Sequence, residues 1–221
     1  MIDLQDVSKS YTAGNDIFHA VDAVSLHIGK GDFIAVTGHS GSGKTTLLSL
    51  MGGLTRPDAG IITIDSTDLW SLSDNDLSAL RNRKMSFIYQ FSSLIPTLTV
   101  KENILLPLVF RAGKKRAPEH ALHLLETVHL QDKANAYPSQ LSGGQQRRVA
   151  IARAFINNPE IVLADEPTGD LDEETETEIM ELFHRMNKTE RITFIMVTHS
   201  SELASRCTRR FRMSHGKLLQ G

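Results

Sequence analysis

The chain has 221 residues, a formal net charge of −2 at pH 7, 40% hydrophobic residues and one cysteine, Cys207. That length fits one domain, or one domain with a subdomain, and can bury a sizeable core without disulfides. The near-zero charge gives no support to generic nucleic-acid binding, and a lone cysteine excludes an internal disulfide and indicates a reduced, passive thiol. No apolar run approaches the roughly 20 residues that span a bilayer, and no signal peptide is visible. If the protein works at a membrane, we expect another chain to provide the spans.

The first part of the chain predicts strands and a helix. Apolar and polar residues alternate twice within residues 1–28, which is typical of antiparallel strands. Residues 33–36 form a short apolar run before a glycine, as expected of a buried strand. A helix is expected over residues 45–52, and another strand over residues 61–64.

The rest of the chain is first mainly helical and then alternating. From residue 74 to about 131 the helical pattern is interrupted by prolines and by a strand expected over residues 85–89, and a long helix is expected over residues 143–157. Two apolar strands then flank a helix, which indicates a parallel sheet with crossover helices. The expected strands are 161–164 and 192–197, and the expected helix is 173–187.

These elements predict one α/β domain over residues 1–221. Its mixed sheet, with an antiparallel N-terminal part, is expected to use residues of about 1–90 and 159–221. The segment of about 91–158 is expected to form a helical subdomain.

A phosphate-binding pattern follows the strand expected at residues 33–36. The pattern G-x-x-x-x-G-K-[ST] is matched by Gly38-His39-Ser40-Gly41-Ser42-Gly43-Lys44-Thr45, and Thr46 comes next. Glycines let backbone N–H groups turn inward around a phosphate, and the helix N-terminus adds a positive dipole end. Lys44 would place its charge on the outer phosphates, and the Thr45 hydroxyl would be a Mg²⁺ ligand. This pattern alone suits kinases, GTPases and helicases equally.

Two carboxylates end the apolar strand expected at residues 161–164. Buried carboxylates are costly unless they meet a cation or a proton donor. Asp165 fits the residue that holds the Mg²⁺ shell of a P-loop enzyme, and Glu166 fits the base that activates the attacking water. The simpler interpretation, a strand that ends in solvated acids, weakens because a P-loop is expected on a neighbouring strand.

A second glycine motif precedes the helix expected at residues 143–157. It reads Leu141-Ser142-Gly143-Gly144-Gln145, and it would place free N–H groups and a hydroxyl at a helix N-terminus. Two phosphate sites in one chain suggest that two chains share each nucleotide. Together with the P-loop and the acids at 165–166, this motif resembles the ABC ATPase family over essentially the whole chain.

The resemblance implies roles for four more residues. Gln90 looks like the glutamine that touches the Mg²⁺ and water site and links it to the helical subdomain. Asp172 looks like the aspartate of the loop that crosses the dimer interface, and His199 like the histidine that contacts the γ-phosphate. Tyr11 looks like the aromatic that stacks on adenine, although an aromatic near an N-terminal strand often only packs.

The resemblance also implies a mechanism. Two copies would meet head to tail and enclose two ATP molecules, and the intact motifs make a homodimer the simpler expectation. Mg²⁺ would be held by Thr45, Gln90 and Asp165, whereas Ser142, Gly144 and Gln145 would come from the other copy. A cleft near residues 90–107 would seat a cytoplasmic helix of a transmembrane permease, with its lining provided by Ser93, Leu94, Ile95 and Pro96. The ATPase would therefore lie at the cytoplasmic face of the cell membrane.

Three segments look like the branch with lipoprotein-release and macrolide-export ATPases. They are residues 51–54, 95–103 and 164–172, while residues 37–40 also resemble the related cell-division ATPase. Two alternatives from other classes stay open: a non-transport ABC ATPase of translation or DNA repair, and a scaffold that binds ATP and signals by shape. Two basic clusters are given the simpler interpretation of solvated surface: Lys114-Lys115-Arg116 in a loop, and Arg147 with Arg148 on a helix face.

Overall fold

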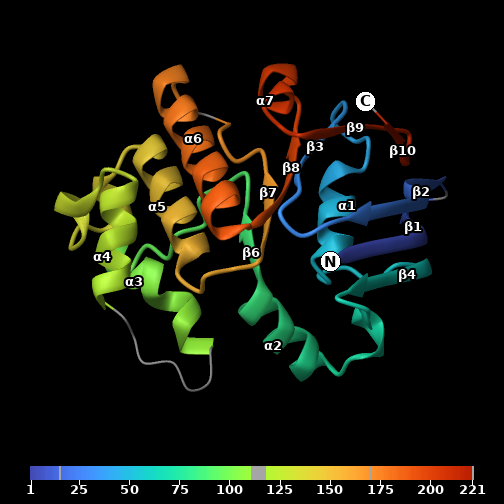
Figure 1. The fold of residues 1–221 in the computed structure, drawn as a ribbon, viewed down its shortest axis with the longest axis horizontal. Helices are drawn as coiled ribbons and strands as arrows, with labels where there is room; N and C mark the ends of the chain where they lie inside the picture. Colours follow the sequence, from blue (N-terminus) through green and yellow to red (C-terminus); the bar gives the residue numbers. More distant parts are fainter. Residues whose placement is uncertain (15, 111–117, 170, 221) are drawn as a thin grey trace.

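The computed structural model describes residues 1–14, 16–110, 118–169 and 171–220. Lys114-Lys115-Arg116 therefore lies outside the described residues, as does Asp170. The described chain forms two sheets with helices around them (Figure 1). This arrangement confirms the expected α/β fold with an antiparallel N-terminal part, a mixed P-loop sheet and helices.

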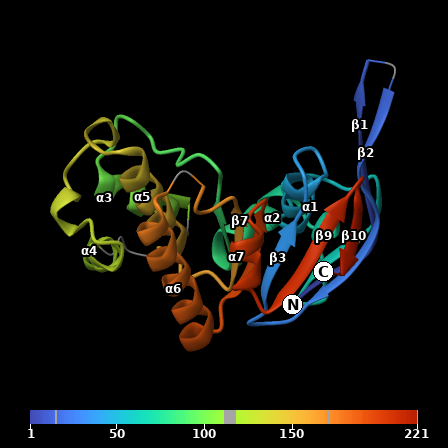
Figure 2. The same cartoon turned by 90° about the horizontal axis from the view of Figure 1, so that it is seen from above.

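The N-terminal sheet is antiparallel and has the strand order β2–β1–β4–β5. Its strands are β1 Ile2–Ala13, β2 Asp16–Ile28, β4 Ala59–Ile64 and β5 Thr67–Asp68. The β1–β2 hairpin extends beyond the body of the molecule (Figure 2). In that hairpin Tyr11 pairs with Phe18 across the strands, so both aromatic side chains lie on one face of the sheet.

The central sheet is mixed and has the strand order β10–β9–β3–β8–β7–β6. Its strands are β3 Phe33–Thr37, β6 Met85–Ile88, β7 Ile161–Asp165, β8 Thr193–Thr198, β9 Arg209–Ser214 and β10 Lys217–Gln220. All neighbours in it are parallel except the final hairpin, β9–β10. That hairpin was absent from the elements expected from the sequence.

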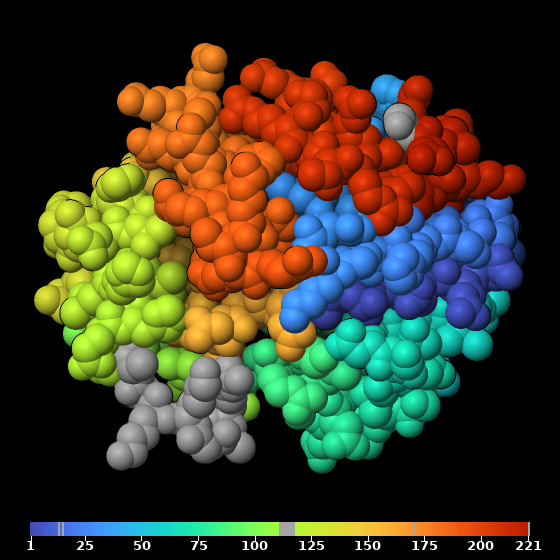
Figure 3. Space-filling view, in the orientation of Figure 1, coloured from blue at the N-terminus to red at the C-terminus, as the bar shows by residue number. Residues whose placement is uncertain are grey.

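Helices cover the central sheet and form one end of the molecule. The α-helices are α1 Lys44–Met51, α2 Asp74–Lys84, α3 Val100–Leu105, α4 Pro118–Thr127, α5 Gly143–Phe155, α6 Glu173–Glu190 and α7 Ser201–Ser205. Short 3₁₀ helices lie at Leu69–Ser71, Leu106–Phe110, Gln131–Lys133 and Pro138–Gln140. Helices α3, α4 and α5 gather at the end opposite the N-terminal sheet (Figure 1), and α6 covers the middle of the face seen in Figure 3.

Two hydrophobic clusters lie on opposite faces of the central sheet. Along β3, Phe33 and Ala35 belong to the cluster with helices α3 to α6, whereas Ile34 and Val36 belong to the cluster with α1 and the N-terminal sheet. Alternate residues of a strand point to opposite faces, so a strand buried on both faces reads as a continuous apolar run. This explains why 33–36, 161–164 and 192–197 carry no polar alternation. Both faces of the sheet are therefore buried under apolar side chains.

Candidate nucleotide site

A cavity of about 360 Å³ lies at the carboxyl ends of the parallel strands. The register places Thr37 beside Thr198 and Asp165 beside Val197, so β3, β7 and β8 end at the same edge. Loops that follow these ends therefore converge, as is usual in open α/β sheets. The lining residues are Phe18, Ser40, Gly41, Ser42, Gly43, Lys44, Thr45, Thr46, Gln90, Asp165, Glu166 and His199.

The loop between β3 and α1 has a conformation that requires glycine. Gly43 has φ +103°, and a Cβ there would lie 1.8 Å from the carbonyl oxygen of Ala20 in β2. Gly41 has φ +74° but nothing within 4 Å of an added Cβ. Both φ values lie in the left-handed region that glycine adopts without a steric penalty. The loop thus packs tightly on the β2 side at Gly43 and is open around Gly41.

Lys44 lies at the start of α1 and is held by the loop itself. Its Nζ donates to the carbonyl oxygens of Gly38 at 2.7 Å and His39 at 3.0 Å. The ammonium group is therefore oriented by backbone acceptors of the loop that precedes α1. A positive charge held in this way suits the recognition of phosphate oxygens. Gly38 itself does not line the cavity but supplies one of the acceptors.

Thr45 and Asp165 form a hydrogen-bonded pair in the lining of the cavity. The Thr45 hydroxyl donates to Oδ2 of Asp165 at 2.9 Å. Burial raises the pKa of the Asp165 carboxyl, the negative charge of Glu166 adds to this, and the Thr45 hydrogen bond and Lys44 oppose it. The carboxylate thus lacks full solvation and would gain from a cation.

This pair fits Mg²⁺ by its chemistry. Mg²⁺ takes hard oxygen ligands and is commonly held by one or two carboxylates, waters and substrate phosphates. A hydroxyl and a carboxylate lie side by side here, and within the described ranges no group of three or more His, Cys, Asp or Glu side chains could hold a metal on its own. A metal at this position would therefore depend on the nucleotide for its remaining ligands.

Glu166 is fixed from three directions. Its Oε2 accepts a hydrogen bond from the Thr198 hydroxyl at 3.0 Å, and its Oε1 lies 2.9 Å from Nδ1 of His199. Its backbone N–H donates to the carbonyl of Val197 at 2.9 Å, and its φ is +45°. A non-glycine residue in the left-handed region is strained, and such strain concentrates at functional sites. The side chain of Glu166 is 13% exposed and that of His199 is 77% exposed, so the pair opens to the cavity on the His199 side.

Phe18 lines the cavity and was missed by the sequence interpretation. Tyr11, expected to stack on adenine, is 44% exposed and does not line the cavity, but it is the cross-strand partner of Phe18. Sequence alone does not reveal this pairing, because the β1–β2 register shifts at irregularities between Leu4 and Ser10. The stacking role of Tyr11 stays a prediction, with Phe18 as a second aromatic beside it.

The second glycine motif lies outside the cavity. Ser142 caps α5, where its Oγ accepts a hydrogen bond from the N–H of Gln145 at 3.2 Å while Gln145 Oε1 accepts one from the N–H of Ser142 at 3.0 Å. Ser142 and Gly143 are exposed, and none of residues 141–145 lines the cavity. The open N-terminus of α5 is thus available to a ligand that this chain's own cavity does not hold.

Asp172 caps α6 and also lies apart from the cavity. Its carboxylate accepts hydrogen bonds from the N–H and the hydroxyl of Thr175 at 2.9 and 2.8 Å. These bonds lower the pKa of Asp172.

Arg147 corrects an expectation. It was interpreted as part of a solvated helix face, but it is 4% exposed and its guanidinium donates to the carbonyl oxygens of Tyr89, Gln90 and Gly169. Arg148 is half-buried and donates to the carbonyl of Val128 at 3.2 Å. The periodicity of a helix does not reveal which loops pack against it.

Comparison with known proteins identifies the family. The model of the family described as "ABC transporter" matches residues 21–169. The chain belongs to the ABC transporter family. It is an ATP-binding protein with the ABC ATPase fold.

Relatives of this ABC ATPase align over nearly its whole length. It is 44% identical over 213 residues to the macrolide export ATP-binding/permease protein MacB of Syntrophobacter fumaroxidans, covering 95% of this chain and 30% of that protein. It is 43% identical to the uncharacterized ABC transporter ATP-binding protein YknY of Bacillus subtilis, covering 96% of this chain and 92% of that protein. It is 44% identical to the lipoprotein-releasing system ATP-binding protein LolD 1 of Chlorobium chlorochromatii, covering 88% and 80%. The chain thus spans under a third of MacB but most of YknY and LolD 1.

A solved structure gives the same picture. The ATP-binding cassette MJ0796, in a dimeric post-hydrolysis state bound to ADP and Pi, superposes with a TM-score of 0.94 at 39% identity, covering 100% of this chain and 98% of that one. A second dimeric structure of MJ0796 also gives 0.94, at 40% identity. Within the described ranges of this ABC ATPase, no helix has the length and apolar character needed to cross a membrane.

Proposed function

We propose that two copies of this ABC ATPase close around two ATP molecules and drive a separate membrane permease. The observation that carries the proposal is the separation within one chain of the P-loop cavity and the exposed, Ser142-capped N-terminus of α5. A helix N-terminus with free N–H groups suits a phosphate. Because it does not face the chain's own cavity, it is available to the nucleotide of a second copy. The dimers of MJ0796 support this proposal.

Each group of residues in the cavity has a different role in ATP hydrolysis. The P-loop backbone and Lys44 bind the phosphates, while Thr45 and Asp165 would hold Mg²⁺ together with Gln90. A bound Mg²⁺ would neutralise charge on the outer phosphates. Glu166 orients and deprotonates the attacking water, and His199 contacts the γ-phosphate. Ser142, Gly144 and Gln145 of the second copy complete the site, so that hydrolysis depends on closure. Asp172 lies at the interface between the copies, and no nucleic acid takes part.

A permease helix would dock beside the segment that follows Gln90. A cavity of about 320 Å³ is lined there by Leu54, Arg81, Asn82, Met85, Ser86, Phe87, Pro107, Arg153, Ala154 and Asn157. Ser93, Leu94, Ile95 and Pro96, which were expected to line such a cleft, are absent from its walls. Large apolar side chains are exposed on the segments that contribute to it, including Leu54 at 45% and Phe110 at 74%. Apolar exposure of this kind favours a protein contact.

We further propose that residues of about 91–158 act as a helical subdomain and carry the motion to the permease. The ATPase would then be held at the cytoplasmic face of the membrane by its partner. LolD 1 and MacB favour a permease of the lipoprotein-release or macrolide-export type. The cell-division type is the alternative within this proposal.

The experiment that tests the proposal is purification of the tagged protein from native membranes in mild detergent with ATP. We expect a membrane permease to co-purify, identified by mass spectrometry. The test variant is Leu54→Glu, which changes an exposed side chain of the docking cavity. This variant should hydrolyse ATP normally but should not co-purify with the permease. Recovery of ribosomes, DNA or only soluble proteins with the wild type would contradict the transporter proposal and leave the ATPase assignment intact.

A further inference from the structure

Arg147 links three functional segments of the chain. It lies in the second turn of α5, whose N-terminus carries the exposed Ser142 cap. Its Nη1 donates to the carbonyl oxygen of Tyr89, and its Nη2 donates to those of Gln90 and, at 3.3 Å, Gly169. Tyr89 and Gln90 follow β6, whereas Gly169 lies three residues after Glu166. One buried guanidinium thus contacts the backbone that follows β6 and the backbone that follows β7.

The segment around Gln90 lies beyond the end of its strand, although the ring of Tyr89 stacks on that of Phe87 in β6. The strand β6 ends at Ile88, and the side chains of Tyr89 and Phe91 are 46% and 74% exposed. A second arginine of α5, Arg153, donates to the carbonyl oxygens of Ser92 and Ser93, both at 2.9 Å. Two arginines of α5 therefore donate hydrogen bonds to the backbone carbonyls of this segment.

We propose that Arg147 is a positioning residue: it fixes Gln90 and the backbone after Glu166 relative to α5. The role of Gln90 in the cavity belongs to the proposed function, and this inference rests on it. A charged donor to several carbonyls is strong when buried, since each bond gains in a low dielectric. When α5 shifts against a nucleotide, Arg147 carries Gln90 with it. The contact of the Ser142 cap with one nucleotide thereby sets the geometry of the chain's own cavity.

The predicted effect is on kcat rather than on nucleotide affinity. Arg147 lies outside the cavity lining, so the P-loop and Lys44 still bind the phosphates when it is changed. Small misplacements of groups around the reacting atoms cost roughly 10- to 100-fold in rate. We therefore expect Arg147→Gln to lower kcat by roughly 10- to 100-fold with KM for ATP within about twofold of wild type. Arg147→Lys, which keeps the charge and fewer donors, should restore part of kcat.

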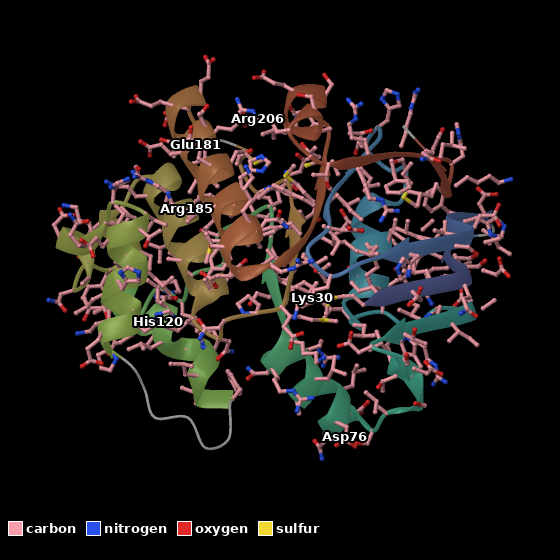
Figure 4. The ribbon with its side chains drawn as sticks, in the orientation of Figure 1. Lys30, Asp76, His120, Glu181, Arg185 and Arg206 are labelled. Carbon is pink, nitrogen blue, oxygen red and sulfur yellow. The ribbon has the colours of Figure 1, made fainter. Side chains whose placement is uncertain are left out.

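The experiment measures steady-state ATP hydrolysis and Tm for wild type, Arg147→Gln, Arg147→Lys and a control. The control is Arg185→Gln, an exposed arginine of α6 (Figure 4), which should match wild type. A fall in kcat at unchanged KM, measured well below the Tm of each variant and with partial recovery in Arg147→Lys, supports the proposal; Tm itself should fall in Arg147→Gln, because three buried carbonyl oxygens lose their donor. Wild-type kcat in Arg147→Gln would overturn the proposal. It would also be overturned if kcat and Tm both fell in Arg147→Gln and neither recovered in Arg147→Lys. Wild-type hydrolysis that does not respond to Glu166→Gln would instead overturn the proposed site.

Discussion

Nδ1 of His199 lies 2.9 Å from Oε1 of Glu166, while the Thr198 hydroxyl holds the other carboxylate oxygen. One oxygen of the Glu166 carboxylate thus faces the Thr198 hydroxyl, and the other faces the exposed imidazole of His199. This geometry leaves Glu166 oriented at the cavity before any substrate binds. It is consistent with a general base whose direction is set by its neighbours.

The first prediction concerns this pair. Glu166→Gln keeps the shape and the hydrogen bond from Thr198 but removes the base, so kcat should fall by at least about 100-fold with ATP still bound. His199→Ala should lower kcat less, because Glu166 keeps its Thr198 contact. Hydrolysis and ATP binding are measured separately on each variant. Cell complementation by the Glu166→Gln variant would favour an ATP-binding scaffold over a transporter.

The second prediction concerns Asp165 and pH. Because burial raises its pKa, the folded state binds the proton more tightly than the unfolded chain does. Its contribution to the free energy of unfolding is therefore most favourable below the unfolded pKa and is lost as pH rises through the raised folded pKa. Asp165→Asn removes this cost, so it should raise Tm of the nucleotide-free protein near pH 7 and abolish hydrolysis. A Tm that falls in Asp165→Asn would contradict this explanation.

Mg²⁺ provides a companion measurement for the same residue. With ATP present, Mg²⁺ should raise Tm of the wild type, since a ligand that binds only the folded state stabilises it. The rise should be largely absent in Asp165→Asn. An equal rise in both proteins would place the metal elsewhere.

The third prediction compares two glycines of the P-loop. Gly43→Ala forces a Cβ to within 1.8 Å of the Ala20 carbonyl oxygen, whereas Gly41→Ala meets nothing within 4 Å. Gly41→Ala should cost about 1–2 kcal/mol for its left-handed φ, and Gly43→Ala at least about 3 kcal/mol because the clash adds to it. Urea unfolding measures both. Equal losses would mean that the loop does not pack on β2 as described.

The fourth prediction concerns the aromatic pair of the hairpin. Stacking of a base on an aromatic ring is worth about 1–3 kcal/mol by alanine substitution, so Phe18→Ala and Tyr11→Ala should each raise KM for ATP roughly tenfold with little change in kcat. Because stacking does not read base edges, KM for GTP should rise in parallel. If only Tyr11→Ala has an effect, Phe18 is a wall of the cavity and not a binding group.

Much of this site was predictable from the sequence because its pattern is local. The P-loop is contiguous, and Asp165 and Glu166 follow an apolar run that reads directly as a buried strand. Register then brings them together, since parallel strands end at one edge. The fold class was confirmed for the same reason: alternating strands and helices constrain the topology.

The features missed depend on contacts between distant segments. Arg147 is buried against carbonyl oxygens up to 58 residues away in the sequence. Helical periodicity does not indicate contacts with such distant segments. Phe18 reaches the cavity through an irregular hairpin register. Strand β9 was not predicted from the sequence because its exposed residues are arginines and its buried residues are only Phe211 and Met213. The cavity proposed for permease docking likewise joins distant segments, since α2, β6 and α5 line it together with Pro107.

The central claim is that each nucleotide site needs two copies of the chain. The most direct test is the mass in solution, by light scattering, of Glu166→Gln with and without ATP, beside the double variant Ser142→Glu/Glu166→Gln. We predict that ATP doubles the mass of Glu166→Gln, and that the double variant binds ATP but keeps the mass of one chain, because a carboxylate at the cap of α5 repels the phosphate. The claim would be contradicted if Glu166→Gln kept the mass of one chain at saturating ATP and the wild type hydrolysed ATP while it also had the mass of one chain.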